Sequence, residues 1–117
     1  MKYFLLVFLF IAQSALACWK AEGTFAVDGE TYKFSQKINH NMEYKFPGAN
    51  FILSMTLKPI DKKTTQVTYK IEEKKNLKLI LVTMGTDEVT NSKSSDIFAK
   101  GEEGQPNSII SIKLTDI

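Results

Sequence analysis

Hydrophobic and polar residues alternate along most of the chain from Trp19 onward, with a period of two residues rather than 3.6. Because successive side chains of a strand point to opposite faces of a sheet, this alternation predicts β-strands that bury one face. Asp28-Gly29 lies between two such segments and predicts a two-residue hairpin turn, whose central positions both need positive φ. We therefore expect a first hairpin that pairs residues 19–27 with residues 30–38.

The middle of the chain predicts a second hairpin, in which residues 50–58 pair with residues 65–73. Pro59 follows the first of these strands and cannot donate a hydrogen bond to a ladder, so we expect the strand to end there. A short strand over residues 42–46 precedes the hairpin. Pro47-Gly48-Ala49-Asn50 then predicts a tight turn, in which proline presets φ and glycine adopts the unusual angle.

The last third of the chain is less regular. Residues 76–84 are apolar on both faces over most of their length, which is typical of a central strand covered on two sides, and residues 86–90 could extend it. Residues 94–100 fit either a single helical turn or an edge strand, whereas the composition of residues 102–107 indicates a loop. Residues 109–115 alternate again and predict the final strand.

Seven or eight short strands without a long helix predict an all-β fold, and we expect a single antiparallel β-sandwich of immunoglobulin-like architecture. A small up-and-down β-barrel is the alternative. The chain has one cysteine and one tryptophan and so lacks the cysteine pair of antibody domains, which limits the likeness to architecture. The predicted inward-facing residues are Phe25, Val27, Tyr32, Phe34, Phe51, Leu53, Val67, Tyr69, Leu79, Leu81, Ile110 and Ile112.

The amino terminus has the organisation of a secretory signal peptide. Lys2 is followed by an unbroken apolar run over residues 3–12 and then by Ala15-Leu16-Ala17, the small-residue pattern of a cleavage site. The run is shorter than the roughly 20 residues that a transmembrane helix needs. We therefore expect a signal peptide over residues 1–17 and one β-sandwich domain over residues 18–117, long enough for a single modest core.

Cys18 directly follows this cleavage pattern and is the only cysteine in the chain. Ordinary signal peptidase would release a soluble protein that begins with Cys18, whereas a bacterial lipobox, which these residues resemble, would make Cys18 the lipidated first residue. Ala15 stands where a lipobox usually has leucine, so both routes stay open. A lone cysteine in an exported protein has no intramolecular disulfide partner, which favours lipidation. We therefore expect a periplasmic or outer-membrane-associated lipoprotein, with a soluble periplasmic or secreted protein as the alternative.

The charge pattern bears on the class of partner. The 15 basic residues, all lysines, stand against 13 acidic residues, for a net charge of +2. Without the arginine fork that recognises phosphates and base edges, we do not expect a nucleic-acid partner. Lysines concentrated between residues 58 and 78 could form a strip that binds polyanions or lipid headgroups, or they could simply protect a sheet edge. This lysine strip consists of Lys58, Lys62, Lys63, Lys70, Lys74, Lys75 and Lys78.

Residues that could carry catalysis or bind a metal are few. His40 is the only histidine and lies in a polar turn without a nucleophile elbow, so we expect a solvated turn residue. One histidine and one cysteine cannot form a structural zinc site. A copper(I) site would need His40 and Met42 with Met55 or Met84, but the last two fall in strands where methionine is ordinary core filler. The sequence therefore predicts neither an enzyme nor a cofactor.

Three functions remain as hypotheses. We favour a non-enzymatic binding or structural module of the cell envelope, tethered to the membrane through Cys18 and partnered by another envelope protein. The alternatives are a small β-barrel that binds an apolar ligand and a secreted or periplasmic enzyme inhibitor that acts through a rigid loop. The candidate partner loops are residues 47–50 and 102–107, with Pro47, Gly48, Asn50, Gln105, Pro106 and Asn107 as candidate contact residues.

Overall fold

The computed structural model describes residues 19–116, which form eight antiparallel strands in two four-stranded sheets. The predicted signal peptide and Cys18 lie outside the described residues. The strands are β1 (Trp19–Val27), β2 (Glu30–Ile38), β3 (Glu43–Pro47), β4 (Phe51–Pro59), β5 (Thr64–Lys75), β6 (Lys78–Thr90), β7 (Ser95–Ala99) and β8 (Ser108–Asp116).

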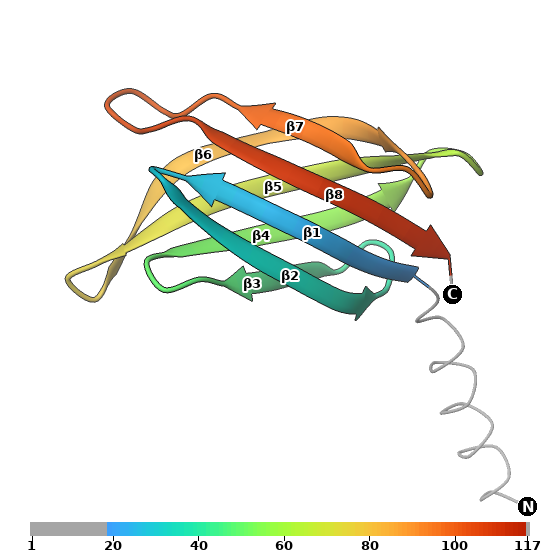
Figure 1. Cartoon of the computed structure of the whole chain (residues 1–117), viewed down its shortest axis with the longest axis horizontal. Helices are drawn as coiled ribbons and strands as arrows, with labels where there is room; N and C mark the ends of the chain where they lie inside the picture. The colour runs from blue at the N-terminus through green and yellow to red at the C-terminus, as the bar shows by residue number, and fades with distance from the viewer. Residues whose placement is uncertain (1–18, 117) are drawn as a thin grey trace, which may run out of the picture.

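The two sheets pack face to face as a β-sandwich, as Figure 1 shows. The first sheet has the strand order β2-β1-β8-β7 and the second has the order β3-β4-β5-β6. Strands that follow one another in sequence are neighbours within each sheet, and β1 also pairs with β8, so the connectivity is an up-and-down meander. The predicted sandwich is therefore confirmed: the meander is interrupted between β2 and β3 and between β6 and β7, and the strands do not close into a barrel.

Both predicted hairpins are confirmed. β1 pairs with β2 in continuous register from Val27 opposite Glu30 to Trp19 opposite Ile38, and the turn between them has φ values of 51° at Asp28 and 78° at Gly29. These positive angles are those that the two-residue turn requires, which is why an Asp-Gly pair predicts it. β4 pairs with β5 along its whole length and ends at Pro59.

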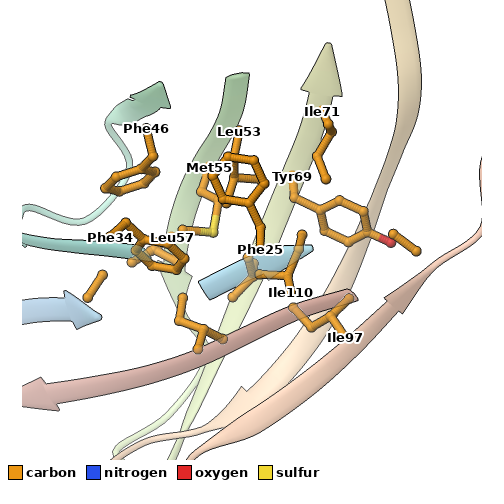
Figure 2. Close-up of a cluster of buried hydrophobic side chains, with 14 of the residues drawn as sticks. Phe25, Phe34, Phe46, Leu53, Met55, Leu57, Tyr69, Ile71, Ile97 and Ile110 are labelled. Carbon is orange, nitrogen blue, oxygen red and sulfur yellow. The ribbon is translucent and has the colours of Figure 1, made fainter. Parts of the chain in front are cut away.

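The core lies between the sheets and contains most of the residues predicted to face inward (Figure 2). The ring centroids of Phe25 and Tyr32 lie 5.1 Å apart, and those of Phe34 and Phe46 lie 4.8 Å apart, so aromatic pairs fill the space beside β2. Tyr32 is half-buried. The other predicted residues that are buried are Val27, Phe51, Leu53, Val67, Tyr69, Ile110 and Ile112.

Strand β6 differs from the prediction in its position and in the direction of its side chains. It is an edge strand of the second sheet rather than a central one. Leu79 and Leu81, predicted to face inward, are 49% exposed and half-exposed, and Met84, predicted to be buried, is 57% exposed. The reason for the exposure of the two leucines is a β-bulge: Ile71 pairs with Thr83 and Glu72 with Leu81, which leaves Val82 as an extra residue. This extra residue turns every side chain of β6 that precedes Val82 to the opposite face of the sheet. Met84 lies after the bulge, on the outer face of this edge strand.

The bulge also connects the two sheets. Val82 and Thr83 are both buried, and each contacts the segment that follows β7. The carbonyl oxygen of Val82 accepts a hydrogen bond from the amide of Glu102 at 2.8 Å, and the Thr83 hydroxyl donates to the carbonyl oxygen of Lys100 at 2.7 Å. β7 is an edge strand of the first sheet, so the strand alternative for residues 94–100 is confirmed and the helical turn is wrong.

Candidate functional site

The sandwich has two ends, and they differ in the turns that they carry (Figure 1). At the end where β1 begins, here called the Trp19 end, Trp19 pairs with Ile38 and with Asp116. The turns after β2, β4 and β6 lie at the same end, because backbone hydrogen bonds join Asn41 to Leu57 and residue 91 to residue 63. The opposite end, here called the far end, carries the turns at residues 28–29, 48–50 and 76–77 and the loop 100–107.

The Trp19 end combines exposed apolar side chains with lysines. Met42 is 51% exposed and Ile60 is 50% exposed. The indole of Trp19 packs edge to face on the imidazole of His40, with ring centroids 5.3 Å apart. His40 is therefore half-buried beside the start of β1 rather than a freely solvated turn residue.

The predicted lysine strip is divided between the two ends. Lys58, Lys62 and Lys63 lie at the Trp19 end, at the close of β4 and in the turn that follows it. The other end of β5 carries Lys74 and Lys75, separated from the first group by a strand of 12 residues, or about 40 Å. Lys78 opens β6 beside them, and Lys70, in the middle of β5, pairs with Glu72 at 3.6 Å. Two separate clusters therefore replace one continuous strip.

The predicted partner loop at residues 47–50 lies at the far end and is held by side chains from two other strands. The Asn50 side-chain amide donates to the Glu30 carboxylate at 2.9 Å and 3.1 Å, and the Lys74 ammonium donates to the carbonyl oxygen of Gly48 at 3.1 Å. The Lys74 amide also donates to the carbonyl oxygen of Asn50 at 2.8 Å. These contacts hold the turn against β2 and β5. The prediction that Gly48 adopts a positive φ in this turn is wrong.

Tyr32 also contacts the turn at residues 47–50. Its hydroxyl donates to Glu30 and accepts from the Asn50 amide at 3.3 Å. Its ring lies so close to Gly48 that a Cβ atom there would lie 2.7 Å from ring carbons. Burial raises the pKa of the Tyr32 hydroxyl above 10.0, and the hydrogen bond to Glu30 raises it further, so the tyrosine stays a neutral donor at neutral pH.

The second predicted partner loop, which contains Gln105, Pro106 and Asn107, also lies at the far end. The Asn107 side-chain oxygen accepts a hydrogen bond from the Gly101 amide at 2.9 Å, and the Gln105 amide donates to the carbonyl oxygen of Glu102 at 2.8 Å. Gln105 and Pro106 are half-buried and Asn107 is exposed. The structure thus brings both predicted loops to one end of the molecule.

The concave features of the described surface are shallow. A depression of about 610 Å³ lies on the outer face of the first sheet and is lined mainly by polar side chains, among them Thr24, Ser35 and Ser111. In the core, the recess between Ala21, Ile38 and Met55 has no room for a water molecule. This recess therefore offers an apolar ligand no space.

The described residues contain no group of three or more His, Cys, Asp and Glu side chains that could hold a metal ion. Met55 is buried in the core as expected, whereas Met84 lies on the outer face of β6, opposite Lys70. Within residues 19–116 no helix has the length and apolar character to cross a membrane.

The sequence did not predict the turn at Asn76 and Leu77, which connects β5 to β6 at the far end. Both residues have positive φ, 51° and 63°, and Leu77 is fully exposed. The sequence contained one indication of this turn, because asparagine adopts positive φ more readily than most non-glycine residues and here directly follows Lys74 and Lys75. The prediction of a strand that begins at Asn76 is therefore wrong at its first two residues, because β6 begins at Lys78.

Comparison of the chain with protein-family models, curated proteins and solved structures finds no match. Its function is therefore inferred from its sequence and geometry.

Proposed function

We propose that this protein is an exported, non-enzymatic binding module of the cell envelope, tethered to a membrane through a lipidated Cys18. The apolar run over residues 3–12 and the Ala15-Leu16-Ala17 pattern before Cys18 support export and cleavage at this point. The lone cysteine supports lipidation, because acylation removes a thiol that has no disulfide partner within the chain. The partner is another envelope protein.

The observation that carries this proposal is the placement of both candidate partner loops at the end opposite Trp19 (Figure 1). Because β1 begins one residue after Cys18, a lipid on that cysteine would hold the Trp19 end against the bilayer. Met42, Ile60 and the lysines at that end suit a surface of anionic headgroups. The loops at residues 47–50 and 100–107 would then project away from the membrane toward a partner.

A second candidate function is inhibition of an enzyme by the loop at residues 47–50. Its hydrogen bonds to Glu30, Tyr32 and Lys74 favour this alternative, because a loop that is already ordered loses little conformational entropy when it binds. Pro47 and Asn50 are both exposed and could enter a cleft.

The test of the tether compares the wild-type chain with Cys18→Ser, each recovered from its own host. An acylated mass and membrane partition for the wild type, with release of Cys18→Ser into the soluble fraction, would support the proposal. A wild-type chain that begins at an unmodified Cys18 and remains soluble would overturn it.

The test of the partner uses a photo-reactive amino acid at Ala49, in the loop of the far end. We expect a discrete cross-link to an envelope protein from Ala49 and none from the matched exposed position Lys93 at the Trp19 end. Equal cross-linking from both positions would argue against a partner at the far end. A cross-linked enzyme whose activity falls when the protein is added would select the inhibitor instead.

A further inference from the structure

The hairpin tip, residues 74–79 where β5 turns into β6, presents an apolar side chain at a position that is unfavourable for two reasons. The second central position of a two-residue hairpin turn is usually glycine, because φ is positive there, but here Leu77 has a φ of 63°. A bulky side chain is strained in this conformation. Leu77 is also fully exposed to water and packs on nothing that would offset the strain.

The rest of the hairpin tip is apolar and positively charged. A groove of about 350 Å³ runs along its outer face, with Ile52, Leu77 and Leu79 as its apolar lining. Leu79 lines this groove only because the bulge at Val82 turns it outward. The remaining lining residues of the groove are Lys74, Lys75, Asn76 and Lys78, and no carboxylate is among them.

This combination matches the surface of an anionic phospholipid bilayer. A lysine ammonium is attracted to phosphate headgroups, whereas leucine and isoleucine side chains gain free energy when they leave water for the acyl region. The hairpin lies at the extreme of the far end and projects from the sandwich, so its apolar residue can enter a deformable surface (Figure 1). An acidic protein would satisfy the lysines but would also have to present a pocket that fits the protruding leucine, whereas a bilayer needs none.

We propose that the hairpin tip inserts Leu77 into the interface of a membrane that contains anionic phospholipids, with Lys75 and Lys78 at the level of the headgroup phosphates. This inference goes beyond the proposed tether and does not rest on it, because the tip lies at the end of the sandwich opposite Trp19. In a lipidated chain the tip would therefore contact a second bilayer, opposite the one that holds the tether.

The experiment uses the Cys18→Ser chain, expressed in full and purified in the form that the host yields, so that no acyl group contributes to binding. Flotation with vesicles of phosphatidylcholine and 30% phosphatidylglycerol is compared with flotation on pure phosphatidylcholine. We expect binding to the anionic vesicles alone, weakened by salt because exposed charges are screened. In the same background, Leu77→Gly should weaken binding about tenfold, since glycine removes the apolar group and fits the turn.

The charge requirement is tested with a pair of matched double variants. Lys75→Glu with Lys78→Glu should abolish flotation, because each lysine near the surface contributes about a factor of five. Lys33→Glu with Lys113→Glu makes the same change in net charge on the outer face of the first sheet and should bind within about twofold of the parent chain. Phe98→Ser, which removes an exposed apolar side chain of β7, is the matched apolar control and should behave in the same way.

Insertion itself is measured with Leu77→Trp and vesicles that contain brominated lipid. We expect the introduced indole to be quenched and its emission shifted to the blue, relative to the chain that contains Trp19 alone. The proposal fails if the parent chain ignores anionic vesicles, if Leu77→Gly binds like its parent, or if the control lysine pair loses binding equally. Cross-linking of the tip to an acidic protein, without vesicle binding, would likewise replace the membrane with a protein partner.

Discussion

Gly23 shows how one residue allows two strands to approach each other. Its φ is 157°, and a Cβ atom built there would lie 1.8 Å from the carbonyl oxygen of Ser111 on β8. The pairing of β1 with β8 joins the beginning of the domain to its end, so a displacement at this point would disturb the first sheet. Glycine is the residue that allows so close an approach of two backbones.

We therefore expect Gly23→Ala to lower the free energy of unfolding by about 1–3 kcal/mol. Thr24→Ala on the same strand is the control and should change it by less than about 0.5 kcal/mol. Urea titration followed by circular dichroism measures both. A Gly23→Ala chain as stable as the parent would show that β1 lies further from β8 than described.

Leu77 gives a prediction of the opposite sign. Replacing Leu77 with glycine relieves a positive φ and removes no packed side chain, so the variant should gain about 0.5–1 kcal/mol of stability. Leu79→Gly, two residues later and inside β6, should instead lose a similar amount, because glycine weakens a strand interior. Thermal melts of the two variants would separate these effects, and a destabilised Leu77→Gly would contradict the strained turn.

Tyr69 predicts how stability responds to alkaline pH. Burial, and next the charge of Asp87, raises the pKa of the Tyr69 hydroxyl above 10.0. The unfolded chain therefore releases this proton first as pH rises, so the stabilising contribution is complete below about pH 10 and declines above it. Tyr69→Phe cannot titrate and should show a shallower decline. Urea midpoints between pH 8 and 11 provide the comparison, and identical slopes for both chains would refute the assignment.

At the scale of elements, the bulge in β6 determines how the loop 100–107 is held. Thr83→Val keeps the shape of the side chain but removes its hydrogen bond to the carbonyl oxygen of Lys100. We expect amide hydrogen exchange in this loop, measured by mass spectrometry, to accelerate about fivefold, the effect of losing roughly 1 kcal/mol. Thr86→Val, on the exposed side of β6, should leave the loop unchanged. If the loop exchanged equally fast in both variants, its own hydrogen bonds rather than Thr83 would hold it in place.

The elements that the sequence predicted well are those fixed by local chemistry. The turn at Asp28 and Gly29 and the stop at Pro59 depend on φ and on a missing donor, properties of the residues themselves. The position of β6 could not be predicted in the same way. Its apolar run was consistent with a central strand, but its place at the edge depends on pairing with β5 alone, and its faces depend on one extra residue at Val82.

The candidate site, too, could be predicted where local chemistry determines it and not where it depends on how the strands pair. Proline, glycine and asparagine identified both partner loops, since these residue types favour turns. That the loops share one end follows from the meander and could not be read from either loop alone. The lysine strip was wrong as a continuous feature, because closeness in sequence along a 12-residue strand is still a separation of about 40 Å.

For the whole molecule, the pairing of Trp19 with Asp116 predicts that the chain tolerates a new order of its strands. A circular permutant that joins these residues by a short glycine-serine linker and opens at Gly104 should fold with a stability within about 1 kcal/mol of the parent. Opening at Ala49 should be more harmful, because that turn contacts β2 and β5. Circular dichroism and urea titration decide, and an unfolded Gly104 permutant would contradict the prediction.

The closeness of Trp19 and Asp116 also decides where a reporter can be attached. A fluorescent protein or affinity tag fused to the carboxyl terminus would emerge beside the residue that follows Cys18. In a lipidated chain it would be pressed against the bilayer and would compete with it for the Trp19 end. A tag inserted at Gly104, in contrast, would extend from the far end, where it could hinder a partner but leave the lipid anchor undisturbed.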